Sequence, residues 1–181
     1  MSLVINIENI GEAGVEINEE FDRSWLSNIP EYTRENDVCY VRDRIKLSGI
    51  LRKEGNNLHL RGAVKLTLHT LCSRCGQEMD YLIDSEFDLV LMQGTERYTE
   101  IEKMLTPDDF NHSYFQGPEL DLTPYFQEQI ALEVPIQFLC RQDCKGICPG
   151  CGCNLNEEDC RCIREEGDPR LAVLRKLKVQ K

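Results

Sequence analysis

The sequence predicts an α+β protein: an antiparallel β-meander with a barrel-like sheet and few helices, followed by a cysteine-rich module of the zinc-ribbon type. Two observations carry this prediction. Apolar residues recur with a period of two through most of residues 38–92, which is typical of strands with one buried face. Seven of the ten cysteines lie within residues 140–162. We therefore expect a mainly β body (1–139) and a module (140–181) that combines a metal site with a basic C-terminal helix.

The amino-terminal part predicts one strand and one short helix. Leu3, Ile5 and Ile7 alternate with other residues, which favours an opening strand. Phe21, Trp25 and Ile29 follow at intervals of four, and Pro30 would end that helix. We assign Trp25 to the core.

Three long apolar series predict the strands of the meander. They are Ile45, Leu47, Gly49 and Leu51; Leu58, Leu60, Gly62, Val64, Leu66 and Leu68; and Tyr81, Ile83, Ser85, Phe87, Leu89 and Leu91. A Gly55-Asn56-Asn57 turn joins the first two series. Charged or polar side chains occupy many of the intervening positions, so we expect one face of this sheet to be solvated.

The segment from Gly94 to Glu119 lacks a clear period, and we expect a long surface excursion there. Thr123 is predicted to cap a helix with Pro124 at its first position, and Pro135 would end it. The same signal at Asp168-Pro169 predicts a last helix whose leucines, among them Leu171, face the body.

The densest cysteine pattern predicts one complete metal site. Cys148-Pro-Gly-Cys151-Gly is a knuckle, a tight turn in which two sulfurs reach one ion, and Cys160 and Cys162 supply a second pair. Four thiolates at such spacing favour tetrahedral zinc. Iron-sulfur ligation stays open as a less favoured alternative, because spacing alone does not distinguish the two.

A second metal site is predicted between distant parts of the chain. Cys72-Ser-Arg-Cys75-Gly lies at the tip of a predicted hairpin and supplies two ligands, and Cys140 and Cys144 are the unassigned pair. A redox pair of the thioredoxin type is disfavoured because strands flank this motif on both sides. Cys39 and Cys153 stay outside both sites, with Cys153 as the most plausible substitute ligand.

Disulfides are the other alternative for so many cysteines. Residues 1–10 have acidic and polar residues where a secretory signal needs a basic start and an apolar core, which argues against an oxidising compartment. No apolar run is long enough to cross a bilayer. These features predict a soluble, cytoplasmic protein.

Charge is distributed unevenly. The net charge is −11, but residues 1–139 hold 12 Lys+Arg against 25 Asp+Glu, whereas residues 140–181 hold 9 against 7. Nucleic-acid contact is therefore expected at the carboxyl end. The acidic body suits a basic protein partner, and a merely solubilising surface explains it equally well.

These motifs, in their order, resemble the YceD family of bacterial and plastid proteins, also called large ribosomal RNA subunit accumulation proteins. The resemblance rests on Cys72-x-Arg-Cys75, on the run from Pro135 through Cys140, Cys144-Lys-Gly-Ile-Cys148-Pro and Cys151-Gly-x-Asn-Leu-Asn, and on Cys160-x-Cys162 with Asp168-Pro-Arg. It implies a role in 23S rRNA accumulation and large-subunit assembly, without an established catalytic activity. Cys39 and Cys153 depart from the pattern of many relatives.

Three classes of function remain to be weighed. The first is a non-enzymatic assembly factor whose zinc sites present basic residues to large-subunit rRNA, its precursors or a ribosomal protein. The candidate contact residues are Arg141, Lys145, Arg161, Arg164, Arg170, Arg175, Lys176 and Lys178. Arg74 is a further basic residue, and it lies between the predicted ligands Cys72 and Cys75 in the sequence. The second is an acidic adaptor for a basic large-subunit ribosomal protein. The third, a metal- or redox-sensing regulator, is favoured over an enzyme, since closed four-sulfur sites leave no open position for a small-molecule substrate.

Overall fold

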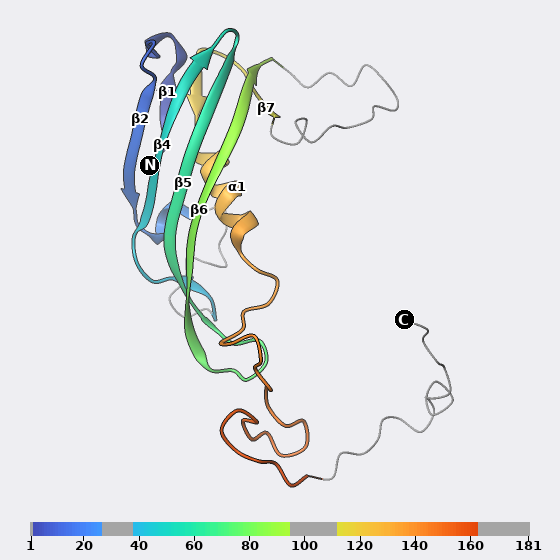
Figure 1. The fold of residues 1–181 in the computed structure, drawn as a ribbon. Helices are drawn as coiled ribbons and strands as arrows, with labels where there is room; N and C mark the ends of the chain where they lie inside the picture. Colours follow the sequence, from blue (N-terminus) through green and yellow to red (C-terminus); the bar gives the residue numbers. More distant parts are fainter. Residues whose placement is uncertain (1, 27–37, 95–111, 163–181) are drawn as a thin grey trace, which may run out of the picture.

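A long, curved sheet carries most of the chain that the structure describes (Figure 1). The structure is a computed structural model, and it describes residues 2–26, 38–94 and 112–162. The strands are β1 (Val4–Asn6), β2 (Val15–Phe21), β3 (Tyr40–Val41), β4 (Ile45–Glu54), β5 (Asn57–Leu71), β6 (Glu78–Gln93), β7 (His112–Phe115) and β8 (Glu119–Asp121). Two short 3-10 helices, η1 (Ile7–Asn9) and η2 (Arg23–Leu26), and one α-helix, α1 (Thr123–Glu133), complete the elements.

The predicted meander is confirmed. The main sheet has the order β2-β4-β5-β6-β7, and its central strands β4, β5 and β6 pair as antiparallel neighbours. Gly55 adopts a φ of +62° in the turn between β4 and β5, a conformation that glycine reaches at little cost. The alternation of buried and exposed residues along β5 runs its whole length, so the period-two pattern indeed marks one buried face.

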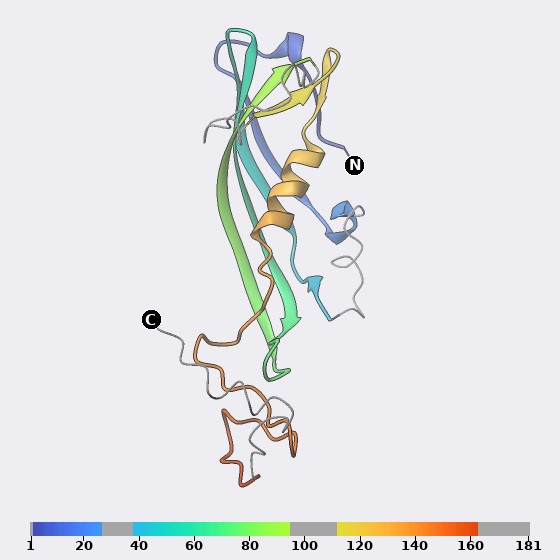
Figure 2. The ribbon, with the colours of Figure 1, turned by 90° about the vertical axis from the view of Figure 1, so that its right-hand side faces the viewer.

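One face of the sheet is covered by α1, and the core lies between them (Figure 2). Phe126 and Ile130 of α1 are fully buried against the sheet. The ring of Phe87 on β6 meets Phe126 edge-on, with centroids 5.2 Å apart. Glycine at position 62, opposite Phe87, leaves room for that ring over the sheet. Helix α1 therefore packs against the middle of the sheet.

Around the sheet, the prediction is wrong in one respect and unconfirmed in another. The expected surface excursion contains strand β7, which pairs in parallel with Val90–Gln93 of β6. Strand β8, which pairs with β1, begins at the last residue of the excursion, Glu119. A four-residue strand with a polar start is too short for period counting to detect. In the described part of the chain β2 and β7 end the sheet without pairing with each other, so a barrel-like closure is not confirmed.

The first predicted helix does not begin at Phe21. Phe21 ends β2, and within the described residues up to 26 the single turn η2 follows it. Phe21 stacks on Trp25 with ring centroids 4.8 Å apart, and Trp25 is buried as expected. The Gln127 amide of α1 donates a 2.6 Å hydrogen bond to the Trp25 carbonyl. Ile29 and Pro30 lie outside the described residues.

Helix α1 begins near Pro124 as predicted, but Thr123 is not its N-cap residue. The N-cap residue is Leu122, and no side chain caps the helix. Thr123 instead accepts a hydrogen bond from the Leu3 N–H, while Asp121 accepts one from the Thr123 N–H, at 2.8 and 2.9 Å. Position 123 therefore ties the amino terminus to the helix. The predicted helix after Asp168 lies outside the described residues, and none of the described helices is long and apolar enough to cross a membrane.

Candidate metal centres

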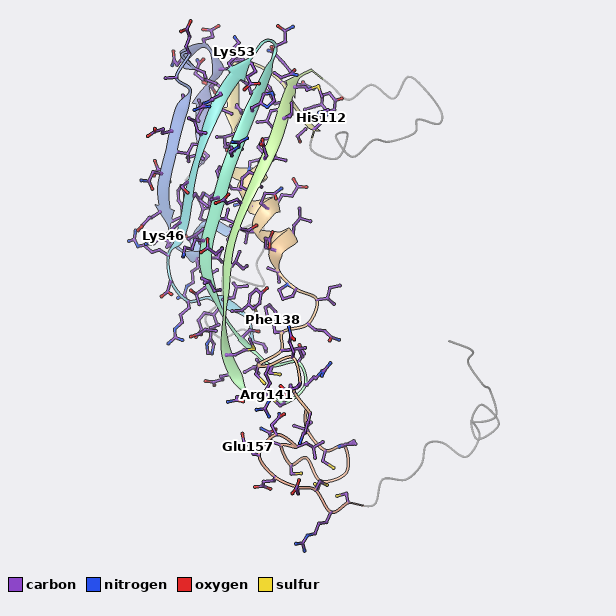
Figure 3. The ribbon with its side chains drawn as sticks, viewed as in Figure 1. Lys46, Lys53, His112, Phe138, Arg141 and Glu157 are labelled. Atoms are coloured by element: carbon purple, nitrogen blue, oxygen red, sulfur yellow. The ribbon has the colours of Figure 1, made fainter. Side chains whose placement is uncertain are left out.

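Two tight turns of the same design bring cysteines together at one end of the sheet (Figure 3). In the first, the Gly76 N–H donates to the Cys72 carbonyl at 2.9 Å, and in the second the Gly152 N–H donates to the Cys148 carbonyl at 2.8 Å. The two glycines have φ values of +72° and +76°. Such positive φ values are accessible to glycine, which explains the Cys-x-x-Cys-Gly sequence of both knuckles.

The hairpin cluster consists of Cys72, Cys75, Cys140 and Cys144. Its four sulfurs lie within 4.8 Å of one another. The Cys72 and Cys144 sulfurs are 3.8 Å apart, and those of Cys75 and Cys140 are 3.7 Å apart. A tetrahedral ion with Zn–S bonds of about 2.3 Å separates its sulfurs by about 3.8 Å. The cluster can therefore hold a metal ion of this size with little movement.

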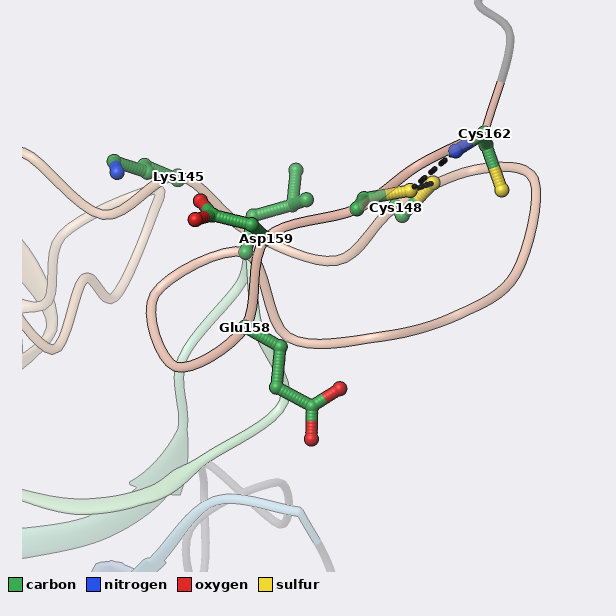
Figure 4. Close-up of a pocket in the computed structure, with 7 residues that line it drawn as sticks. Lys145, Cys148, Glu158, Asp159 and Cys162 are labelled. Atoms are coloured by element: carbon green, nitrogen blue, oxygen red, sulfur yellow. Dashed lines mark hydrogen bonds between the residues drawn. The ribbon is translucent and has the colours of Figure 1, made fainter.

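The terminal cluster consists of Cys148, Cys151, Cys160 and Cys162, whose sulfurs also lie within 4.8 Å. The Cys151 and Cys160 sulfurs are 3.6 Å apart, and the Cys160 and Cys148 sulfurs are 3.2 Å apart. A tetrahedral ion would widen the closer pair by about 0.6 Å. A hollow of about 420 Å³ beside this cluster is lined by Cys148, Cys162, Lys145, Glu158 and Asp159, among others. Figure 4 shows these residues, with Cys148 and Cys162 close together.

The two clusters differ in exposure. Cys72 and Cys144 of the hairpin cluster are buried, with 3% of each residue exposed, whereas Cys151 and Cys162 of the terminal cluster are exposed. All ten cysteines are free of disulfide bonds. The hairpin cluster is therefore the better protected of the two metal-binding arrangements.

Hydrogen bonds from both backbone and side chains hold the hairpin tip against the chain that follows α1. The Ser73 N–H donates to the Phe138 carbonyl at 2.7 Å, and the Phe138 N–H donates to the Ser73 hydroxyl at 3.1 Å. The Ile147 N–H donates to the Arg74 carbonyl at 3.1 Å, and the Arg74 guanidinium donates to the Cys144 carbonyl at 2.9 Å. These bonds position Cys140 and Cys144 opposite the knuckle even before a metal is considered.

Hydrogen-bond donors favour the thiolate at Cys72 and at Cys148, whereas burial raises the pKa of Cys140 to about 12 and the Cys160 side chain raises the pKa of Cys162 to about 12. Burial opposes ionisation of Cys72, but N–H groups of Cys140, Arg74 and Cys75 outweigh it and lower the pKa of Cys72 to about 6. The Cys151 N–H, with the Cys160 side chain, lowers the pKa of Cys148 to about 6. Ionised thiolates are the form that binds metal.

Asn156 contacts the hairpin cluster, which the sequence pattern did not predict. Its amide donates to the Cys144 sulfur at 3.3 Å, and its Oδ1 accepts from the Lys145 N–H at 2.8 Å. The Asn-Leu-Asn motif was visible in the sequence, but nothing in its spacing indicated a sulfur partner. Asn156 therefore links the chain after the second knuckle to the hairpin cluster.

A family model described as "Large ribosomal RNA subunit accumulation protein YceD" matches residues 60–178. The chain belongs to the YceD family. The matched range includes most of β5, all of β6 and α1, and every cysteine of both clusters. YceD membership is therefore carried by the region that builds the candidate metal centres.

Individual relatives agree with this assignment. The chain is 28% identical over 152 residues to the protein of Arabidopsis thaliana named "Large ribosomal RNA subunit accumulation protein YCED homolog 1, chloroplastic", covering 72% of this chain and 47% of the relative. The protein of the same name from Zea mays is 26% identical over 150 residues, covering 70% and 46%. "Uncharacterized protein YlbN" of Bacillus subtilis is 31% identical over 111 residues, covering 59% and 58%. The chain thus spans about half the length of these relatives, and no solved structure matches it significantly.

The two remaining cysteines lie outside both groups of four. The Cys153 carbonyl accepts a 2.8 Å hydrogen bond from the Cys148 N–H, which places Cys153 beside the terminal cluster. Its neighbours, above all the Cys151 side chain, raise the pKa of Cys153 to about 12. Cys39 packs against the hydrophobic core, and burial raises its pKa.

The candidate contact residues fall into two groups. Arg141, Lys145 and Arg161 are exposed on the chain around the clusters, and Arg141 forms a 3.5 Å ion pair with Asp143. Arg164, Arg170, Arg175, Lys176 and Lys178 lie outside the described residues. Arg74, whose guanidinium binds the Cys144 carbonyl, supports the hairpin cluster.

Proposed function

We propose that this YceD protein is a non-enzymatic factor that supports accumulation of 23S rRNA and assembly of the large ribosomal subunit, and that zinc ions in both clusters fix its module (140–181) to its body (1–139). The functional part of this proposal rests on the family and on the names of the chloroplast relatives. Those names concern longer proteins, so the role is carried to this chain as an inference.

The observation that carries the structural part is the hairpin cluster. Two of its sulfurs come from the tip of the β5–β6 hairpin and two from the chain after α1. A metal bound there would crosslink segments that are 65 to 72 residues apart in sequence. Structural zinc supplies on the order of 10 kcal/mol or more of folding free energy in small peptides, so this ion would order the module.

The donor set supports a structural role. Each cluster offers four cysteine sulfurs, whereas a catalytic zinc site keeps an open position and usually includes histidine or a carboxylate. With four thiolates bound, neither ion would have a position left for water or substrate. The proposal therefore assigns no catalytic step to the clusters.

Contact with RNA is proposed for the module, because its Lys and Arg outnumber its acidic residues 9 to 7, whereas the body has 12 against 25. Phosphate is repelled by an acidic surface and attracted by lysine and arginine. Lys145 and Arg161 are exposed beside the clusters. Metal binding would hold these cations on one rigid surface.

The test is complementation in cells that lack their own copy of the gene. The ratio of 23S to 16S rRNA is measured after expression of the wild-type chain, of Cys144→Ser, or of Cys39→Ser as a matched control outside the clusters. We expect wild type and Cys39→Ser to restore the ratio and Cys144→Ser to fail at equal protein level. Full restoration by Cys144→Ser would contradict the role of the hairpin cluster, and failure of the wild-type chain would contradict the role in rRNA accumulation.

Direct RNA contact needs its own measurement. Ultraviolet crosslinking in cells, followed by sequencing of attached RNA, compares wild type with a variant in which Arg175, Lys176 and Lys178 are replaced by serine. Enrichment of large-subunit rRNA precursors that fades in the variant is expected. A wild-type chain without enrichment favours the second candidate, an adaptor that binds a basic ribosomal protein through its acidic body.

A further inference from the structure

The edge of β6 that faces away from β5 is only partly paired. Strand β7 pairs with Val90–Gln93, and in the described part of the chain no strand pairs with this edge from Glu78 to Leu89. Along such an edge, the N–H and C=O groups of alternate residues point outward. Figure 2 views the sheet from this side and shows β6 along its length, with α1 on one face of the sheet. The edge therefore offers a row of backbone donors and acceptors to an added strand.

The solvent face beside this edge is acidic. Its exposed carboxylates are Glu78, Asp80, Asp84, Glu86 and Asp88. Asp84 pairs with Lys65 at 2.5 Å and Asp88 with Arg61 at 3.1 Å, while Asp80 pairs with Arg42. These three cations lie on β5 or just after β3, on the side opposite the free edge. Among the described residues Glu78 and Glu86 have no ion-pair partner, so the row stays negative.

The other face of this half of β6 turns apolar side chains, among them Tyr81, Ile83 and Phe87, toward the hydrophobic core, and it also makes a polar contact with the end of α1. The Ser85 hydroxyl donates to the Glu133 carboxylate at 2.7 Å, and the Tyr81 and Phe138 rings meet with centroids 5.4 Å apart. Residues 133–138 therefore run beside this half of β6, on the face that α1 covers. Two large apolar side chains here are exposed to solvent: Leu132, in the last turn of α1, is 71% exposed, and Ile136, in the segment after the helix, is 102% exposed.

We propose that this edge of β6 binds an extended segment of another protein in which lysine or arginine alternates with apolar residues. In an added strand, successive side chains point to opposite faces. Basic side chains would then meet the acidic row, and apolar ones would meet Leu132, Ile136 and their neighbours. Backbone pairing supplies affinity, and the two unlike faces supply specificity.

The charges disfavour the other occupants. A second copy of this chain paired edge to edge would bring its own acidic row beside the first, and like charges across strands are destabilising. RNA phosphate would meet the same repulsion. The inference stands apart from the rRNA proposal, because it concerns the body and needs neither cluster.

The test uses the full chain and a blocked ten-residue peptide that alternates lysine and valine. Binding is measured by fluorescence anisotropy, and hydrogen exchange locates the site. A control peptide has the same sequence with an N-methyl group on every residue, which removes the N–H donors along both of its edges and keeps the charge. We expect the first peptide to bind and to slow exchange within residues 78–89, and the control to bind at least ten-fold more weakly.

Charge variants complete the test. Glu86→Lys on β6 should weaken binding about five-fold, in line with exposed ion pairs worth up to about 1 kcal/mol. Glu16→Lys on β2, an exposed glutamate at the other end of the sheet, is the matched control and should change little. Equal binding of the N-methylated peptide, or slowed exchange on β2 alone, would overturn the proposal.

Two further outcomes would assign the edge to a different occupant. A five-fold gain in peptide affinity when Arg175, Lys176 and Lys178 are replaced by serine would show that the chain's own end competes for the edge. Sedimentation of the full chain as a dimer that the peptide dissociates would show that a second copy occupies it. Either result would overturn the proposal of a foreign segment.

Discussion

The sulfurs of Cys72 and Cys144 lie 3.8 Å apart although 72 residues separate them in the sequence. Cys72 directly follows β5 and Cys144 lies beyond α1, so this pair closes a loop that contains β6, β7, β8 and α1. Closing so long a loop is entropically costly, and a metal crosslink offsets that cost. The hairpin cluster is thus the point at which the sheet and the module depend on each other.

Metal content tests this dependence directly. The wild-type chain, purified with zinc present, should contain two zinc ions, and Cys144→Ser should contain one, because the terminal cluster stays complete. Elemental analysis of the purified proteins measures both, with Cys39→Ser expected to keep two. An unchanged zinc content in Cys144→Ser would mean that the hairpin cluster holds no ion. A coloured protein that contains iron and sulfide would show that the clusters bind an iron-sulfur centre and not zinc.

Removing metal should unfold the module and spare the sheet. The buried hydrophobic core lies in the body, whereas within residues 140–162 the buried residues are Cys144, Gly146 and Cys148. After chelation, hydrogen exchange should become fast across residues 138–162 and stay slow across β4, β5 and the middle of β6. Readdition of zinc should restore protection. Equally fast exchange in the sheet would show instead that the body also needs the ions.

The sequence predicted those parts of the fold that depend on local pattern. Period-two apolar series located β4, β5 and β6, and repeated Cys-x-x-Cys-Gly spacing located both knuckles, because each signal lies within a few residues. The grouping of Cys72 and Cys75 with Cys140 and Cys144 has no local signal in the sequence, and it is predicted only because the other ligands are already assigned. Strand β7 and the bond from Asn156 to the Cys144 sulfur were missed, since both depend on contacts between distant segments.

Gly146 should be sensitive to substitution for two separate reasons. Its φ is +76°, and a Cβ added there would lie 2.9 Å from the Arg74 carbonyl oxygen, which accepts the Ile147 N–H. Alanine pays about 1–2 kcal/mol for the left-handed conformation, and the contact would also push the hairpin tip away from the module. We expect Gly146→Ala to weaken zinc binding at the hairpin cluster about ten-fold or more, measured by competition with a chelator.

Gly55→Ala is the matched control for that experiment. Gly55 also has a positive φ, +62°, but nothing lies within 4 Å of an added Cβ, and it sits in the β4–β5 turn. It should reduce the stability of the sheet slightly and leave zinc affinity unchanged. Equal zinc affinities of the two variants would show that the contact with Arg74 has no role in ordering the cluster.

The pairing of Gly62 with Phe87 predicts that the effect of Gly62→Ala on stability changes sign when Phe87 is replaced by alanine. A Cβ at position 62 would lie 2.4 Å from the Phe87 ring, and its three nearest atoms all belong to that ring. Gly62→Ala should therefore destabilise the metal-loaded protein by about 1–3 kcal/mol, the usual cost of overpacking. In a Phe87→Ala background the obstruction is gone, and alanine in a strand is favoured over glycine by about 0.5–1 kcal/mol.

Urea unfolding followed by circular dichroism of the sheet, on all four members of this cycle, measures the coupling. Gly49→Ala is the matched control, because its added Cβ would meet the Arg61 carbonyl oxygen at 2.6 Å, a backbone atom that the Phe87 substitution leaves in place. Its cost should be the same in both backgrounds. Additive effects of Gly62→Ala and Phe87→Ala would mean that the ring does not rest on Gly62, and that α1 is seated on the sheet by other contacts.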